Sequence, residues 1–352
     1  MSRSSRPRPL RRLQLAAALA AALGLAACST TGVADDGSST TATAAGSDAF
    51  PVTIEHAFGE TTIEEQPTRV ATVAWANQDV AAQLGVVPVG VPTIEWGGND
   101  NGSTDWFDAA IEGEAAPTQY SEADGVNVEA IAKLQPDVIL AVYSGLSQED
   151  YDKLSKIAPV VAQPGDPYIV PWQDLTTTIG TALGKSEQAQ DLVEETEAAF
   201  AETAAAHPEL EGTSVIYGSP DAVNKNNFYL YLPGDARVDV LTALGMTIPP
   251  VIEETAKGTK EFFANYSTEK ADALESDVLV TYYDAATKTS KEDIEADPLL
   301  GKIPAVAAGA MAGTEDKQVG LAMSAVSPLS LDYAFEHFIP EVAAAAKAAK
   351  AN

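Results

Sequence analysis

Residues 186–207 read SEQAQDLVEETEAAFAETAAAH, and this stretch determines how the rest of the chain is divided. It contains neither glycine nor proline, opens with a serine that can cap a helix, and is followed by Pro208. Leu192, Val193 and Phe200 are among its apolar residues, which recur at helical spacing. The pattern predicts one unbroken helix of ~20 residues, which is about 30 Å long.

Short β-branched runs alternate with amphipathic stretches on both sides of this helix, as is typical of layered α/β folds. In the first half the expected strands are 52–54, 61–63, 69–73, 86–91, 137–142 and 158–161, and the expected helices are 79–84, 128–134 and 148–157. In the second half the series runs through 213–217, 228–232, a helix over 237–244, 277–282 and 305–311.

The predicted fold class is therefore α/β, with two Rossmann-like lobes joined by the single long helix and a ligand cleft between the lobes. The expected boundaries are 50–170 for the N-terminal lobe, 171–208 for the helical connection and 209–352 for the C-terminal lobe. A rigid helix between lobes permits only small changes in their relative angle. An ordinary surface helix inside one large domain is the alternative that this pattern leaves open.

The N-terminus has the layout of a cleaved export signal. Five arginines and no acidic residue precede the apolar run 13–27, which is shorter than the ~20 residues that span a bilayer. Leu25-Ala26-Ala27-Cys28 forms a lipobox around the only cysteine of the chain. We therefore expect residues 1–27 to be a removed signal peptide and Cys28 to carry palmitate, which anchors the protein at the outer face of the cytoplasmic membrane. A secreted protein with a chance cleavage site is the alternative, and Arg11-Arg12 leaves both the general and the twin-arginine export routes open.

Composition restricts the partners of the mature chain. Removing the signal takes five of the 21 basic residues and none of the 51 acidic ones, so the charge becomes 16 minus 51, or −35. Nucleic acids and anionic lipid surfaces are therefore not expected to bind. Residues 29–49 are almost entirely Ser, Thr, Ala, Gly and Asp, so they cannot build a core, and we expect 28–49 to form a lipidated flexible tether.

Several motifs, in this order and at this spacing, resemble the helical-backbone class of substrate-binding proteins of ABC importers, in the branch that carries iron-siderophore complexes and vitamin B12. The motifs are EHAFG at 55–59 before PTRV at 67–70, LGVVPVG at 84–90, NVEAIAKLQPDVIL at 127–140, IAPVV at 157–161, and SPLSL at 327–331 with Tyr333 and Pro340. PWQD at 171–174 leading to IGTALGK at 179–185 is similar to actinobacterial iron-siderophore receptors. Each motif alone is weak, but together they cover nearly the whole mature chain.

The resemblance implies a non-enzymatic, monomeric lipoprotein that binds a ferric siderophore and delivers it to an ABC permease dimer for iron uptake, in a Gram-positive actinobacterial cell. Because the siderophore already chelates the iron, we expect no cofactor and no metal site built by the protein. The acidic field of the chain favours a neutral or cationic hydroxamate over an anionic tris-catecholate. A cobalamin or haem carrier of the same class and an exported hydrolase are the alternatives.

Aromatic residues are the candidate ligand contacts, because an aromatic cleft suits a chelate whose periphery is rich in carbon. The resemblance favours ligand contact over core packing for Trp75, Trp96 and Trp172, whereas Trp106 is expected to pack in a loop. Tyrosines on or just after predicted strands are further candidates, and ordinary strand packing is the alternative for each. The tyrosines in this setting are Tyr143, Tyr217, Tyr229, Tyr231, Tyr282 and Tyr283, of which we expect Tyr143, Tyr217, Tyr231 and Tyr282 to contact the ligand.

Arg69 and Arg237 are the two arginines that remain after the signal. Arg237 follows Pro233-Gly234-Asp235 and opens a predicted helix, where the helix dipole disfavours a cation. It resembles the family arginine that reaches toward the bound iron complex, and a salt bridge to Asp235 or Asp239 is the alternative. Arg69 begins a core strand and is expected to be structural.

Two glutamates occupy matched settings, Ser147-Gln148-Glu149-Asp150 and Ser267-Thr268-Glu269-Lys270. In each, the serine can cap a helix and the glutamate lies in its first turn, and capping alone can explain both. The resemblance implies a second role, in which Glu149 and Glu269 meet arginines on the two permease subunits, one glutamate from each lobe.

No local motif supports an enzyme. Ser267-x-x-Lys270 matches the serine motif of penicillin-recognising enzymes, but the companion motifs of those enzymes do not follow it. His56, His207 and His337 are far apart and show no metal-ligand spacing.

Overall fold

A computed structural model describes residues 48–351, which fall within one compact unit. The predicted signal 1–27, the lipidation site Cys28 and the tether as far as residue 47 lie outside the described residues. Asp48, near the end of the predicted tether, contacts the helical connection: its carboxylate accepts a hydrogen bond from the backbone N–H of Ser186 at 2.8 Å.

The first lobe is built on a five-stranded, all-parallel sheet with the order β5-β4-β3-β6-β7. Its strands are β3 (Val70–Thr72), β4 (Gly90–Pro92), β5 (Thr118–Tyr120), β6 (Val138–Ala141) and β7 (Val160–Ala162). The accompanying helices are α1 (Asn77–Gln83), α2 (Asp105–Ala110), α3 (Val128–Leu134) and α4 (Gln148–Leu154), and a hairpin of β1 (Val52–His56) and β2 (Gly59–Ile63) precedes them. Every residue of β3, β6 and β7 is buried, as expected for parallel strands that are covered on both faces.

The second lobe contains a mixed five-stranded sheet with the order β10-β9-β8-β11-β12. β8 (Val215–Pro220), β11 (Val278–Tyr282) and β12 (Met311–Thr314) are parallel, and β9 (Asn227–Tyr231) and β10 (Phe263–Ser267) add an antiparallel ribbon at one edge. Its helices are α7 (Ala236–Ala243), α8 (Pro250–Ala256), α9 (Lys291–Ala296), α10 (Pro304–Ala307) and α11 (Lys317–Ser324), with 3-10 turns η1 (Thr268–Ala273), η2 (Ala285–Thr287) and η3 (Leu300–Lys302).

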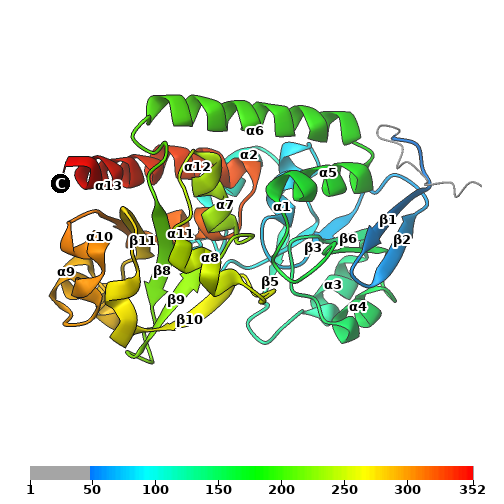
Figure 1. Ribbon diagram of the computed structural model, residues 1–352. Helices are drawn as coiled ribbons and strands as arrows, with labels where there is room; N and C mark the ends of the chain where they lie inside the picture. The colour runs from blue at the N-terminus through cyan, green and yellow to red at the C-terminus, as the bar shows by residue number, and fades with distance from the viewer. Residues whose placement is uncertain (1–47, 352) are drawn as a thin grey trace, which may run out of the picture. The chain divides into compact units, whose positions relative to one another are not determined.

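A long helix connects the two lobes, as the sequence predicts. It is α6 (Ser186–Ala206), with 21 residues, preceded by α5 (Trp172–Leu183). In Figure 1, α6 runs along one side of the molecule, over α5 at one end and over α12 (Pro328–His337) at the other. Its buried residues, which include Val193 and Phe200, recur at helical spacing and face these two helices. The α/β class with a helical backbone is therefore confirmed.

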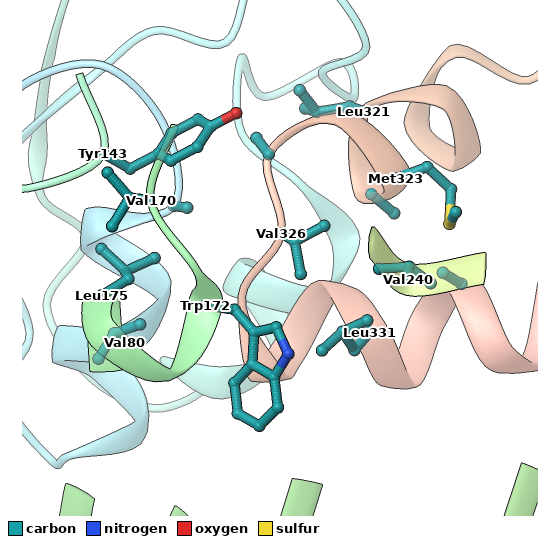
Figure 2. Close-up of a cluster of buried hydrophobic side chains, with 14 of the residues drawn as sticks. Val80, Tyr143, Val170, Trp172, Leu175, Val240, Leu321, Met323, Val326 and Leu331 are labelled. Atoms are coloured by element: carbon teal, nitrogen blue, oxygen red, sulfur yellow. The ribbon is translucent and has the colours of Figure 1, made fainter. Parts of the chain in front are cut away.

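The C-terminal segment contacts both lobes. After α11, helix α12 packs against α1 and α2 of the first lobe, and α13 (Ile339–Ala351) then lies against β11 and β12 of the second. One continuous hydrophobic cluster includes residues from both lobes, such as Val80, Trp172 and Leu331, which Figure 2 shows together. This second crossing restricts the lobes further than the long helix alone.

Two predicted strands differ from the structure. The segment 86–91 forms a strand only from Gly90, because the backbone N–H of Val86 instead bonds to Ala81 and closes the end of α1. The segment 305–311 divides into α10 and β12, because Pro304 opens a helix and Gly309 turns the chain with a φ of +69°. In both cases, residues that were expected in a strand because of their β-branched side chains instead form the end of a helix or the turn that follows it.

Asp79 is a buried carboxyl where α1, α2 and α12 meet. Its Oδ2 accepts hydrogen bonds from Nε1 of Trp106 at 2.9 Å and from the hydroxyl of Ser327 at 2.8 Å. Within the described residues, Oδ1 is buried with no hydrogen-bond partner. Burial raises the pKa of Asp79 to about 6, although the two hydrogen bonds act in the opposite direction. Trp106, expected in a loop, is thus part of a buried polar contact on α2.

The Asp79→Asn variant is expected to lose one component of the pH dependence of stability. Because the folded state holds the Asp79 proton at higher pH than the unfolded state, the wild-type protein loses stability as the pH rises from about 4 to about 6. The difference in the free energy of unfolding, variant minus wild type, should therefore increase by about 3 kcal/mol over that interval. Urea unfolding at several pH values measures it. A difference that stays constant with pH would contradict this assignment.

Candidate ligand-binding site

A cavity of about 500 Å³ lies between the two sheets. The first lobe supplies residues that follow β3, β6 and β7, at the carboxyl ends of parallel strands. In this sheet β4 and β5 lie on one side of β3, and β6 and β7 lie on the other. The carboxyl end of β3 is therefore a topological switch point, which is where α/β sheets form ligand-binding crevices. Seven of the ten lining residues are aromatic: Trp75, Tyr143, Tyr168, Tyr229, Tyr231, Phe262 and Phe263, with Asp235, Arg237 and Ser324.

Trp75 is held in a strained turn between β3 and α1. The residues on either side, Ala74 and Ala76, have φ values of +60° and +65°, which non-glycine residues rarely adopt. The fully buried Asn77 donates from Nδ2 to the carbonyls of Trp75 and Tyr143, at 3.0 and 3.2 Å, and its Oδ1 accepts from backbone N–H groups after β6. One amide group therefore fixes the backbone of Trp75 and Tyr143, two of the three aromatic residues of this wall, before any ligand binds.

Glu122 supports the same turn from the end of β5. Its Oε2 accepts a hydrogen bond from the backbone N–H of Ala74 at 3.0 Å. Burial raises the pKa of Glu122 to about 7, and the bond from Ala74 acts in the opposite direction. This carboxyl therefore stabilises the strained backbone beside Trp75.

Arg237 lies on the second-lobe wall of the cavity. Asp235 caps α7, and its carboxylate receives Nε and Nη2 of Arg237 at 2.8 and 2.7 Å, so the ion pair is bidentate. The guanidinium carbon lies 3.7 Å from the centre of the Tyr231 ring. The two side chains are only 11% and 4% exposed, so the salt bridge is formed in a largely desolvated place and leaves this wall without net charge.

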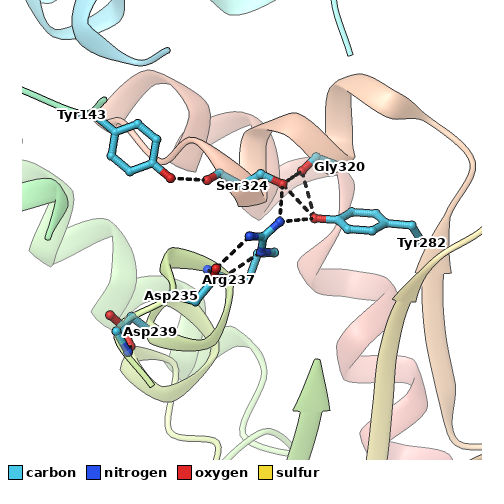
Figure 3. Close-up of polar contacts among 8 residues, drawn as sticks. Tyr143, Asp235, Arg237, Asp239, Tyr282, Gly320 and Ser324 are labelled. Atoms are coloured by element: carbon cyan, nitrogen blue, oxygen red, sulfur yellow. Dashed lines mark hydrogen bonds and ion pairs between the residues drawn. The ribbon is translucent and has the colours of Figure 1, made fainter. Parts of the chain in front are cut away.

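Ser324 joins both lobes at the floor of the site (Figure 3). Its carbonyl accepts a hydrogen bond from the Tyr143 hydroxyl of the first lobe at 2.8 Å. Its hydroxyl contacts Nη1 of Arg237 at 3.1 Å and the Tyr282 hydroxyl at 2.8 Å. Within the described residues, Nη2 of Arg237 uses one of its two N–H groups, in the bond to Asp235, so a second N–H remains for a ligand oxygen.

A smaller cavity of about 190 Å³ lies at the carboxyl ends of β8, β11 and β12. Trp96 and Tyr282 line it, with ring centres 6.1 Å apart at 82°. Trp96 comes from the first lobe and is 41% exposed. Tyr282, which lines the smaller cavity, forms hydrogen bonds with Ser324 and Arg237, which line the larger one. These three polar side chains therefore separate the two cavities.

The structure brings six of the eight predicted ligand residues to these cavities. Trp75, Tyr143, Tyr231 and Arg237 line the larger one, and Trp96 and Tyr282 line the smaller one.

The other two, Trp172 and Tyr217, lie elsewhere. Trp172 is 9% exposed at the start of α5, where its ring stacks on Phe200 of α6 with centres 6.0 Å apart, so it belongs to the core (Figure 2). Tyr217 is 2% exposed beneath Tyr231 and Tyr282 and reaches neither of the two cavities. Trp172 packs against α6, and Tyr217 lies buried in the middle of β8, so neither side chain reaches the edge of the sheets where the cavity forms.

Six lining residues are not among the predicted ligand contacts: Tyr168, Tyr229, Asp235, Phe262, Phe263 and Ser324. Tyr168 ends the turn-rich stretch Gln163-Pro164-Gly165-Asp166-Pro167 directly after β7, so its position after a strand was a usable signal. Phe262 and Phe263 are adjacent aromatics at the start of β10, a strand that the sequence pattern did not indicate.

Both predicted docking glutamates are exposed. Ser147 caps α4 as expected, accepting from the N–H of Asp150 at 3.1 Å, and Glu149 forms an ion pair with Lys153 at 2.8 Å. Glu269 instead lies in the 3-10 turn η1, and Ser267 makes no side-chain capping bond there. The two settings are therefore less alike than their sequences indicate.

Other predicted residues have structural surroundings. Arg69 bonds through Nε to the carbonyl of Gln135 at 3.0 Å, at the end of α3, as a structural role requires. Across the part of the chain that the structure describes, no three or more His, Cys, Asp or Glu side chains form a group that could hold a metal ion. Within residues 48–351, no helix combines the length and the apolar character needed to cross a membrane.

Comparison with known proteins relates this architecture to solute capture. The profile of the periplasmic binding protein family matches residues 70–317. The structure is similar to that of PiaA from Streptococcus pneumoniae TIGR4 in complex with ferrichrome, with a TM-score of 0.78 and 37% identity over 84% of this chain and 99% of that one.

Two curated relatives come from Bacillus subtilis (strain 168). The "Probable siderophore-binding lipoprotein YfiY" is 28% identical over 40% of this chain and 41% of its own length. The "Iron(3+)-hydroxamate-binding protein YxeB" is 27% identical over 56% of each chain. The chain thus aligns with about half the length of these curated relatives.

Proposed function

The chain belongs to the periplasmic binding protein family, and on that premise we propose that it captures a ferric hydroxamate siderophore and delivers it to an ABC importer for iron uptake. The observation that carries the proposal is the cavity of about 500 Å³ with seven aromatic residues and one arginine. Aromatic faces bind the carbon-rich periphery of a chelate, and a few polar groups fix its orientation. This arrangement supports binding without chemistry, as in a carrier rather than an enzyme.

The electrostatics support a hydroxamate. Three hydroxamates balance the charge of Fe(III), whereas three catecholates leave the complex strongly anionic. The cavity offers one cation, Arg237, which Asp235 already neutralises, and the chain without its predicted signal carries a net charge of 16 minus 51, or −35. An anionic complex would therefore be repelled and only weakly compensated. The ferrichrome complex of PiaA and the name of YxeB support the same class of ligand.

The cargo brings its own metal coordination. Arg237 has a free N–H on Nη2 and lies beside the aromatic rings, so it can donate to the chelating oxygens while the rings contact the chelator backbone. The strained Trp75 turn and the Ser324 bonds place both walls in advance, which reduces the entropy lost on binding.

Delivery of the siderophore to the permease would require both the lipid anchor, which holds the protein at the membrane, and one docking contact from each lobe. Cys28 would carry the lipid that holds the protein at the outer face of the membrane, beside a permease dimer. Glu149 and Glu269 would each contact an arginine of one permease subunit. The contacts between the lobes at α6 and α12 favour small closure on binding.

Uptake of radioactive iron as ferrichrome, in cells that lack their own copy of the gene, tests this function. Wild-type protein should restore uptake, and the double variant Glu149→Ala, Glu269→Ala should reduce the rate at least tenfold because the docking charges are lost. Ferrichrome affinity of the purified variant should stay unchanged, since both side chains are exposed and neither lines the cavity.

Glu129→Ala is the matched control for the docking pair. Glu129 lies in the first turn of α3 and pairs with Lys133 at 2.7 Å, just as Glu149 pairs with Lys153 at 2.8 Å. Removing such an exposed pair has little effect on stability. Normal uptake by the double variant would rule out docking through these glutamates, and no uptake by the wild-type protein would contradict the carrier function itself.

A further inference from the structure

We propose that Asp221 is a positioning residue that holds Tyr229 in the cavity wall and, through the loop 221–226, fixes the segment that carries Glu269. This loop connects β8 to β9, and the carrier function proposed above gives it no role. The consequence for Glu269 rests on the docking role proposed above, whereas the consequence for Tyr229 does not.

Asp221 is the hydrogen-bond centre of the loop. Its Oδ1 accepts from the backbone N–H groups of Val223 and Asn224, each at 2.9 Å, which orders the turn. Its Oδ2 accepts from the Tyr229 hydroxyl at 2.8 Å and from Nδ2 of Asn227 at 3.2 Å. These bonds, that from Asn224 first, hold the pKa of Asp221 well below its usual range, so the carboxylate is ionised at neutral pH.

Tyr229 links this carboxylate to the ligand cavity. The residue lines the cavity from β9, and its ring meets the edge of Phe263, another lining residue, with centres 5.9 Å apart at 72°. A tyrosine with a free hydroxyl can rotate about its χ1 angle, whereas a charge-assisted hydrogen bond selects one rotamer. Asp221 therefore sets the position of an aromatic face that contacts the cargo.

The same loop contacts the start of η1. The backbone N–H of Thr268 donates to the carbonyl of Asn226 at 3.1 Å, and its hydroxyl donates to the carbonyl of Lys225 at 3.2 Å. Asn227 ties the two strands of the ribbon, because its Nδ2 also donates to Oδ1 of Asn265 at 2.9 Å. Glu269 directly follows Thr268 and is exposed.

Hydrogen bonds and the short backbone of the loop thus link the cavity wall to Thr268, the residue directly before the proposed docking residue. Cargo that packs on Tyr229 restricts its ring, which restricts Asp221, the loop and then Thr268. Contiguity alone does not demonstrate coupling, so the test measures Thr268 directly.

Ligand affinity tests the first half of the proposal. Asp221→Asn keeps an oxygen for the turn but cannot accept as many bonds, and Tyr229→Phe keeps the ring and the loop carboxylate. Each should weaken ferrichrome binding about fivefold, and the double variant should weaken it no more than either single one, because both remove the same bond. The exposed Asp191→Asn on α6 should bind like wild type. Wild-type affinity in both single variants, or additive losses in the double variant, would overturn this half.

Hydrogen exchange at the Thr268 amide tests the second half. Without ligand, this amide should exchange at least threefold faster in Asp221→Asn than in wild type or Asp191→Asn. Saturating ferrichrome should slow its exchange in wild type and slow it less in Asp221→Asn. Equal exchange in the ligand-free proteins, or equal protection by ferrichrome, would overturn the coupling. The docking role of Glu269 is measured separately by uptake, so its failure would leave these exchange results unaffected.

Discussion

Arg237→Ala is expected to weaken ferric hydroxamate binding about 100-fold, the largest effect of any single substitution in the site. The guanidinium supplies a charge-assisted hydrogen bond to the chelate, worth about 1.5–3 kcal/mol. Its removal also leaves Asp235, which is 4% exposed, as an unpaired carboxylate facing the chelating oxygens. The two effects act in the same direction, and fluorescence or calorimetric titration with ferrichrome measures their sum.

The double variant Arg237→Ala, Asp235→Ala separates the two effects. It removes the unpaired carboxylate and should regain about tenfold in affinity over Arg237→Ala, while the bond to the chelate stays lost. Breaking a buried ion pair also costs about 3–5 kcal/mol in folding free energy, so thermal unfolding must accompany each titration. Arg237→Lys keeps the charge but not the bidentate geometry and should fall between. Wild-type affinity in a folded Arg237→Ala protein would exclude ligand contact by this residue.

Trp75→Ala and Trp172→Ala are expected to have opposite consequences. Trp75 lines the cavity and is only partly buried, so its loss should weaken ferrichrome binding about 10- to 30-fold, with little change in stability. Trp172 packs on Phe200 in the core between α5 and α6, so its loss should lower the free energy of unfolding by about 3–5 kcal/mol. Affinity should then be retained in the Trp172→Ala protein that remains folded.

Chemical unfolding and ferrichrome titration of the same two preparations measure both quantities. Phe is the matched replacement at each site, because it keeps most of the aromatic area and should reduce either effect by more than half. If Trp172→Ala weakened binding as much as Trp75→Ala, while its stability stayed near wild type, the division between core and site would be wrong.

The fold could be predicted from the sequence because its main signals are long or repeated. Residues 186–207 have one clear period and no breaking residue, and the structure has α6 at 186–206. The helical pattern over 128–134 predicts α3 at its observed bounds, where Asn127 caps the start and Arg69 bonds to the carbonyl of Gln135 at the end. The strand predictions for 86–91 and 305–311 were wrong over part of each segment. Composition does not show which backbone groups form the hydrogen bonds that end a helix.

The site was less predictable, because it forms where segments distant in sequence meet. Trp75, Tyr143 and Arg237 line the cavity, and each has a signal in the sequence, because it follows a strand or opens a helix with an unusual residue. Tyr217 and Trp172 are aromatic residues in similar sequence settings, but their side chains are buried in the core rather than directed into the cavity. Ser324 carries no such signal, since its role depends on contacts with Tyr143, Arg237 and Tyr282 from three other segments.

The most direct test of the carrier proposal is a titration of the purified protein, followed by its tryptophan fluorescence, with ferrichrome, a ferric tris-catecholate, haem and cobalamin. Trp75 and Trp96 line the two cavities, so bound cargo should quench the emission. We predict saturable one-to-one binding of ferrichrome, much weaker binding of the other three, and no turnover of any of them. Tight binding of the catecholate alone, or of haem or cobalamin in place of ferrichrome, would contradict the account.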